Sequence, residues 1–147
     1  MKRIALILAC LMPWPAVADP PKASAPAADL GKPLTAAEFE AYALGKTLSY
    51  GAAGQVWGQE EYLPGRQVVW AFTGQACQYG TWTEEMSVDD APLICFLYED
   101  DPEQKCWEFF KGTSGLVAQF LGDGGTSLAE VGQTSEPMNC PGPKVGV

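Results

Sequence analysis

Five cysteines are the residues whose chemistry is most readily argued from this chain of 147 residues. Cys10 lies in the apolar N-terminal segment, and Cys77, Cys95, Cys106 and Cys140 lie further along. Removal of Cys10 with a signal peptide would leave four cysteines, and an even number in an exported domain indicates disulfides. A zinc site would need close Cys pairs or histidines, and the sequence contains neither. We therefore expect two disulfides and no metal site.

The remaining candidates for catalysis are few, because the chain has no histidine. We place the acids mainly in solvated turns, namely Glu84–Glu85, Asp89–Asp90 and Glu99–Glu103, and not in a catalytic pair. Glu108 is the acid that we place within a strand, on its outer face. The turn Glu99–Glu103 lacks the ligand spacing of a calcium loop. We expect a protein that is not an enzyme and that uses no cofactor.

Four tryptophans are the candidate ligand-contacting residues: Trp57, Trp70, Trp82 and Trp107. In a small β-barrel such side chains either line a cavity or fill the core. Because the domain is small, a filled core is the favoured expectation. The alternative is a cavity that holds a small apolar ligand.

An export signal is predicted at the N-terminus. Lys2 and Arg3 precede the apolar run Ile4–Met12, and the segment ends in Ala16–Ala18. We expect residues 1–18 to be a signal peptide cleaved after Ala18, and the protein to be periplasmic or secreted. The apolar run is too short for a transmembrane span.

A lipid anchor is the alternative to simple cleavage, because Ile7–Cys10 also satisfies a lipobox in which Cys10 would be modified. The apolar run before Cys10 is short, which favours ordinary cleavage. Loss of Lys2 and Arg3 would change the net charge from −9 to −11. Such an acidic protein is not expected to bind nucleic acid.

The rest of the chain divides into a Pro- and Ala-rich leader (19–33), one β-rich domain (34–140) and a flexible tail (141–147). The domain begins with a capping box, Thr35 to Glu38, and a short helix that ends at Gly45. Its apolar stripe must dock across the open end or the face of a sheet, since so short a helix is unstable alone. The stripe consists of Phe39, Tyr42, Ala43 and Leu44.

Short strand patterns with turn punctuation follow the helix. We predict a mainly β (α+β) fold in which seven or eight antiparallel strands form a meander, closed partly or fully into a small barrel. A tight hairpin is expected at Thr73-Gly74. The expected strands are 47–52, 59–63, 67–72, 75–83, 93–98, 105–111, 116–121 and 127–133.

One hairpin fixes a register. If Leu97 pairs with Gln104, Cys95 lies opposite Cys106, close enough for a disulfide. The same register predicts one aromatic core face, made of Ile94, Phe96, Tyr98, Trp107 and Phe109.

Four cysteines allow three pairings, and only this hairpin distinguishes between them. It favours Cys95–Cys106 and leaves Cys77 to pair with Cys140, which would secure the C-terminal tail.

Three motifs resemble those of small exported alphaproteobacterial proteins of unknown function. They are Gly45-Lys46-Thr47 after the helix, Gly80-Thr81-Trp82, and Leu93-Ile94-Cys95 before Cys106-Trp107. Gly80-Thr81-Trp82 is also similar to the Gly-Xaa-Trp of lipocalins. The resemblance covers residues 34–140 and implies a lipocalin-like, partly closed barrel without implying an activity.

These features together predict a non-enzymatic module of the bacterial periplasm that binds a small apolar ligand or a protein. The alternative is an acidic inhibitor of a basic partner enzyme such as a lysozyme, to which the negative charge would steer it.

Overall fold

The computed structural model describes residues 30–122 and 124–140. The predicted signal peptide, the Cys10 anchor, most of the leader and the tail 141–147 lie outside the described residues.

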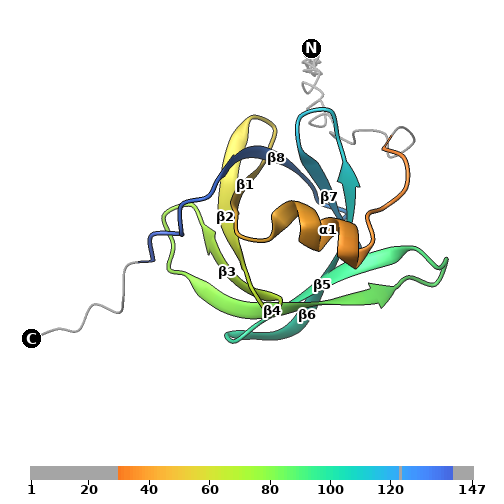
Figure 1. Ribbon diagram of the computed structural model, residues 1–147, viewed down its shortest axis with the longest axis horizontal. Coiled ribbons are helices and arrows are strands. Elements are labelled where there is room, and N and C mark those ends of the chain that lie inside the picture. The colour runs from red at the N-terminus through yellow and green to blue at the C-terminus, as the bar shows by residue number, and fades with distance from the viewer. Residues whose placement is uncertain (1–29, 123, 141–147) are drawn as a thin grey trace, which may run out of the picture.

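Eight antiparallel strands form a closed barrel, in which each strand pairs with the next and β8 pairs with β1 (Figure 1). This confirms the predicted mainly β fold with a short N-terminal helix, and the barrel is fully closed. The elements are α1 (Ala36–Ala43), β1 (Thr47–Ala52), β2 (Gln55–Leu63), β3 (Gln67–Phe72), β4 (Gln78–Met86), β5 (Pro92–Tyr98), β6 (Asp101–Lys111), β7 (Leu116–Phe120) and β8 (Ser127–Thr134).

Four strand boundaries differ from the prediction by three or more residues. β2 begins at Gln55, and β4 begins at Gln78 and continues to Met86. A turn forms at the predicted Thr73-Gly74, where the Gln75 amide donates to the Phe72 carbonyl (2.9 Å), but the strand pairing ends at Trp70 and Gln78, so the tight hairpin expected there does not form. The Thr73 amide instead donates to the Trp57 carbonyl and extends the contact with β2 (2.8 Å). β6 begins at Asp101, because strand pairing continues through acidic residues that composition alone assigns to a turn.

The capping box of α1 forms as predicted. The Thr35 hydroxyl accepts from the Glu38 amide, and the Glu38 carboxylate accepts from the Thr35 amide (2.9 Å). This exchange satisfies amide groups that the first helical turn leaves without partners. Gly45 follows the helix with a φ of 74°, a left-handed conformation in which glycine carries no steric cost.

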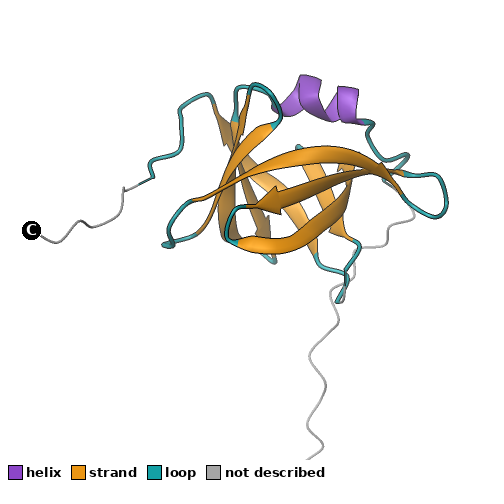
Figure 2. Ribbon diagram, turned by 90° about the horizontal axis from the view of Figure 1, so that it is seen from below, coloured by secondary structure: helices purple, strands orange, loops and turns teal. Residues whose placement is uncertain are grey.

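The helix lies across one end of the barrel (Figures 1 and 2). Phe39 is 0% exposed and enters the barrel, where its ring is 5.3 Å from those of Tyr62 and Trp82 and 4.5 Å from that of Phe109. Edge-to-face aromatic pairs add to the burial energy. The expectation that the stripe docks across an open end is confirmed.

One member of the expected stripe is wrongly placed. Leu44 is 47% exposed, whereas Ala36 is buried in its stead. Leu44 has a ψ of 129°, so the backbone has already left the helical conformation and no longer directs its side chain along the stripe.

Two carboxylates from the sheet hold the helix on the barrel. Glu84 accepts from the Ala36 amide (3.0 Å), and Glu130 accepts from the Tyr42 hydroxyl (2.8 Å) and the Leu116 amide (2.9 Å). Glu84 belongs to β4, so its expected place in a turn is wrong.

Both expected disulfides are present, Cys95–Cys106 and Cys77–Cys140. Cys95 is directly opposite Cys106, but a bulge follows Phe96 and replaces the expected Leu97–Gln104 pair. The aromatic core face survives because the bulge lies beyond the cysteines. Ile94, Phe96 and Phe109 are buried in the core, and Tyr98 and Trp107 pack against it.

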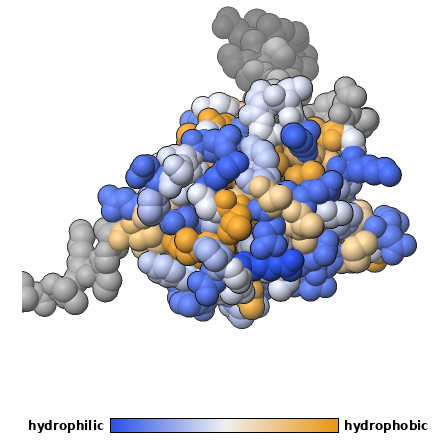
Figure 3. Space-filling model, in the orientation of Figure 1, coloured by the Kyte–Doolittle hydropathy of each residue, from blue (hydrophilic) through white to orange (hydrophobic). Residues whose placement is uncertain are grey.

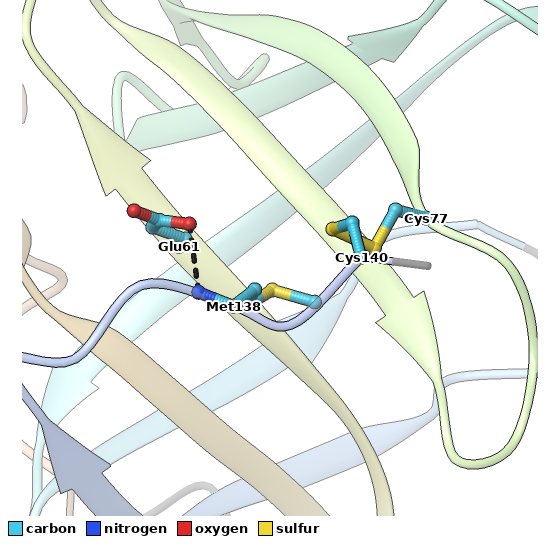
Figure 4. The surroundings of a disulfide bond; sticks show 4 residues. All are labelled: Glu61, Cys77, Met138 and Cys140. Carbon is cyan, nitrogen blue, oxygen red and sulfur yellow. Dashed lines mark hydrogen bonds between the residues drawn. A yellow bond between two sulfur atoms is a disulfide. The ribbon is translucent and has the colours of Figure 1, made fainter. Parts of the chain in front are cut away.

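The disulfide Cys77–Cys140 fastens the chain after β8 to the loop between β3 and β4 (Figure 4). Between these points the Met138 amide donates to Glu61 on β2 (3.0 Å), and the Thr47 hydroxyl donates to the Glu136 carbonyl (2.8 Å). These contacts hold the segment 136–140 against the barrel.

The face that carries α1 has hydrophobic residues scattered among more numerous hydrophilic ones (Figure 3). Scattered apolar residues of this kind are normal on a soluble surface.

We predict that Phe39→Ala lowers the free energy of unfolding by about 3–5 kcal/mol, because it leaves a cavity at the centre of the aromatic cluster. Leu44→Ala is the control, at the residue that follows the last turn of α1 and is about half exposed, with an expected change within about 0.5 kcal/mol. Denaturant unfolding measures both. Equal losses for the two variants would contradict the role of Phe39 as a plug.

Candidate functional site

A cavity of about 180 Å³ lies inside the barrel. Its outer lining includes Trp57 near the start of β2, Phe72 at the end of β3, Gln78 at the start of β4 and Asp101 at the start of β6. These strand ends lie opposite those that contact α1, since Tyr62 near the other end of β2 packs on Phe39. The helix therefore closes one end of the barrel, and the cavity opens toward the other.

Aromatic side chains form most of the cavity wall. Trp70 and Trp107 line it from β3 and β6, and Trp57 and Phe72 stand at its mouth, each more than 40% exposed. Gly58 leaves room for the Trp70 ring, which a Cβ atom at that position would meet at 2.7 Å. Three of the four singled-out tryptophans are thus brought together at one cavity.

Trp82 does not join the other three tryptophans. It is buried at the helix end against Phe39, with the Arg66 guanidinium 4.5 Å from its ring centre. Trp82 therefore fills the core, and Trp57, Trp70 and Trp107 line the cavity.

A β-bulge places Trp57 at the mouth. Tyr50 of β1 pairs with Gly58, and the next residue, Gly51, pairs with Val56, so Trp57 is the extra residue on β2. Bulges redirect side chains that regular alternation would send to the other face.

The cavity contains one buried carboxyl group, that of Glu60, which is 4% exposed. It accepts hydrogen bonds from the Tyr62 hydroxyl (2.8 Å) on one oxygen and from the Tyr98 hydroxyl (2.6 Å) on the other. Tyr50 lies 2.9 Å from the Tyr62 hydroxyl, oxygen to oxygen. The four residues, Tyr50, Glu60, Tyr62 and Tyr98, form a polar cluster in an otherwise apolar interior.

Burial raises the pKa of Glu60 from its ordinary value of 4.5 to about 7, and the hydrogen bonds from Tyr98 and Tyr62 oppose the shift. The pKa values of Tyr50, Tyr62 and Tyr98 rise well above 10.0, chiefly through burial and the nearby Glu60 charge. The tyrosines therefore stay protonated, while Glu60 changes charge near neutral pH.

One basic side chain, Lys105, lines the cavity, and it is already paired. Its ammonium nitrogen lies 3.3 Å from an Asp101 oxygen and 2.9 Å from a Glu103 oxygen. The hydrogen bond that the Glu103 amide donates is the largest single cause that lowers the pKa of Asp101, and Lys105 lowers it further. This ion cluster lies at the rim of the cavity. The positive charge of Lys105 is paired there with the carboxylates of Asp101 and Glu103.

A second, wider depression of about 600 Å³ lies where β3, β4 and β5 meet. Its lining mixes the exposed side chains of Tyr79 and Leu97 with the acidic residues Glu99 and Asp101. Although it is larger, the carboxyl groups that it presents are exposed or half-exposed at its edge. The aromatic cavity, which holds a fully desolvated carboxyl group, is therefore the stronger candidate site.

Glu60 is the residue that sequence reasoning missed. We expected Glu108 to be the acid within a strand, although the predicted strands 59–63 and 127–133 also contain Glu60 and Glu130, and Glu84 lies in a strand as well. Glu60 shares a strand face with Tyr62, but Glu61 shares the other face with Leu63, so the alternation along this strand does not decide which acid faces inward.

Comparisons with protein-family models, with curated proteins and with solved structures find no match. Within residues 30–122 and 124–140 there is no helix long and apolar enough to cross a membrane. The same residues contain no group of three or more His, Cys, Asp or Glu side chains placed to hold a metal ion. The fold and site thus define a disulfide-braced, eight-stranded barrel with an aromatic cavity and one buried carboxyl group.

The raised pKa of Glu60 predicts a pH-dependent stability. Because the folded state binds this proton more tightly than the unfolded state, stability is full below pH 4.5 and falls as the pH rises to about 7. The loss attributable to Glu60 is on the order of 3 kcal/mol. No histidine titrates in this range.

Denaturant unfolding of the wild type and of Glu60→Gln between pH 4.5 and 8 isolates this contribution as the difference between the two proteins. Glu61→Gln, at the next position on β2, is the control and should retain the wild-type difference between low and neutral pH. Parallel pH profiles for the wild type and Glu60→Gln would show that Glu60 is not desolvated in the folded state.

Proposed function

We propose that the protein is a non-enzymatic, exported binding protein that holds one small ligand inside its barrel. The cavity that opens opposite α1, with aromatic walls and one buried polar cluster, is the observation that carries this proposal. Binding sites for small molecules are typically apolar concavities with a few placed polar groups.

The size of the cavity limits the ligand. An engineered apolar protein cavity of about 150 Å³ binds benzene, so the 180 Å³ found here suits a molecule of about that size. Drug-sized ligands occupy sites of roughly 300–1,000 Å³. A long-chain lipid, of the kind that wider barrels carry, therefore does not fit.

The chemistry of the lining supports binding over catalysis. A carboxyl group with a pKa near 7 also suits a general acid or base. Both Glu60 oxygens, however, already accept tyrosine hydroxyl groups, and the described lining contains no serine, threonine or cysteine nucleophile. We therefore assign Glu60 to recognition of the ligand.

Two disulfides indicate an oxidising compartment. Together with the signal peptide predicted at residues 1–18, they support the periplasm as the place of action. We prefer a small-ligand carrier to an acidic inhibitor of a basic enzyme, because overall charge alone does not account for the cavity.

Filling the cavity should abolish binding. Ala118 is buried and lines the cavity, so in Ala118→Leu the larger side chain would occupy the space of the ligand. Ala129→Leu is the matched control. Ala129 lies on β8 with its side chain exposed, so the substitution adds the same atoms outside the barrel. A panel of benzene-sized neutral and cationic molecules, followed by tryptophan fluorescence, measures the effect.

We expect at least one member of the panel to bind the wild type and Ala129→Leu but not Ala118→Leu. Near-UV circular dichroism checks that both variants keep the native packing. If no member binds the wild type, or if Ala118→Leu binds as well as the wild type, the ligand site is not this cavity.

A further inference from the structure

The Glu60 carboxylate has no positively charged partner among the described residues. The ion pairs of this part of the chain join Arg66 to Glu40, and Lys105 to Asp101 and Glu103. A buried charge is normally paired, because leaving water without a partner is costly. Glu60 is therefore a buried acid whose countercharge the fold does not supply.

The tyrosine hydroxyl groups around Glu60 are arranged for its ionised form. Tyr62 and Tyr98 donate to its two oxygens, and since the Tyr62 proton points at Glu60, Tyr50 must donate to Tyr62. Hydroxyl protons thus converge on the carboxyl group, which is the pattern that stabilises a negative charge. They cannot neutralise it, so the site still lacks a cation.

The walls beside this carboxylate are formed largely by aromatic side chains. The rings of Phe96 and Tyr98 are stacked with an interplanar angle of 8°, and Trp70 and Trp107 line the same space. Aromatic faces carry negative electrostatic potential and attract ammonium groups, most strongly where water is excluded. The cavity thus combines aromatic walls with a carboxylate, and both of these favour a cation.

We propose that the cavity binds a small organic cation, a quaternary ammonium or protonated amine with compact apolar substituents, whose charge lies beside Glu60. This inference rests on the proposed ligand-binding function and specifies its ligand. The acidic balance of the chain, with 18 acidic against 9 basic residues, would favour the approach of such a cation.

The proposal implies a dependence on pH. A cation in the cavity favours ionised Glu60, so binding should tighten as the pH rises through about 7, and should release a proton below that pH. Other titratable groups face this site or its rim: Tyr50 from β1, Tyr62 from β2, Tyr98 from β5, and Asp101 and Lys105 from β6. Glu130 of β8 does not line the cavity, but its charge acts on Tyr50. The pKa of Glu60 is raised to about 7, so the ionisation of Glu60 is the change expected near neutral pH.

Choline and its uncharged carbon analogue, in which a tert-butyl group replaces the trimethylammonium group, test the proposal. They have nearly the same shape, and choline keeps its charge at every pH. Titration calorimetry and tryptophan fluorescence on the intact, disulfide-bonded protein at pH 8 should show choline binding roughly 30-fold more tightly than the analogue. The preference for choline over the analogue should weaken at pH 5.5, because Glu60 is then protonated.

Glu60→Gln should lose most of the preference for choline while still binding the analogue, which also shows that the variant is folded. Glu61→Gln, its outward-facing neighbour, should keep the preference. Equal binding of the two probes by the wild type, abolished by Ala118→Leu, would overturn the cation assignment and leave the cavity as a neutral-ligand site. Binding of neither probe to the wild type, while only neutral members of the panel bind in the cavity, would also overturn this assignment. If no panel member binds, the proposed function itself fails.

Discussion

The insertion of Phe39 into one end of the barrel is the contact on which the rest of the structure depends. A closed eight-stranded barrel has an interior that side chains must fill, or water and ligands will enter it. Phe39 contacts Tyr62, Trp82 and Phe109 and closes the end under α1. Because the helix packs against that end of the barrel, the cavity opens at the opposite end.

The cavity imposes an energetic cost that the rest of the fold must offset. Burial of Glu60 destabilises its charged form, and the space beside it forgoes packing contacts that a filled core would have. The two disulfides add covalent constraints outside the cavity, and the segment 136–140 adds hydrogen bonds to the barrel. This distribution is typical of proteins in which a functional site is less stable than its scaffold.

Local signals predicted the scaffold well, and the site poorly. The capping box at Thr35 and the opposition of Cys95 and Cys106 follow from short-range spacing, and both are present. β2 is different, because both of its faces carry large apolar residues, with Tyr62 beside Glu60 on one and Leu63 beside Glu61 on the other. Alternation alone cannot decide which acid faces inward. The bulge at Trp57 depends on pairing with β1, which no local pattern specifies.

Two strand glutamates show how burial alone fails to identify a functional group. Glu130 is buried, but its partners are the Tyr42 hydroxyl of the helix and the Leu116 amide of β7, which tie scaffold elements together. Glu60 is equally buried, yet its partners are side chains of the barrel interior, and it lines the cavity. Removing Glu130 would loosen the helix, whereas removing the charge of Glu60 would alter hydrogen bonds within the barrel interior. The access of Glu60 to an open space, more than its burial, therefore distinguishes it as the recognition group.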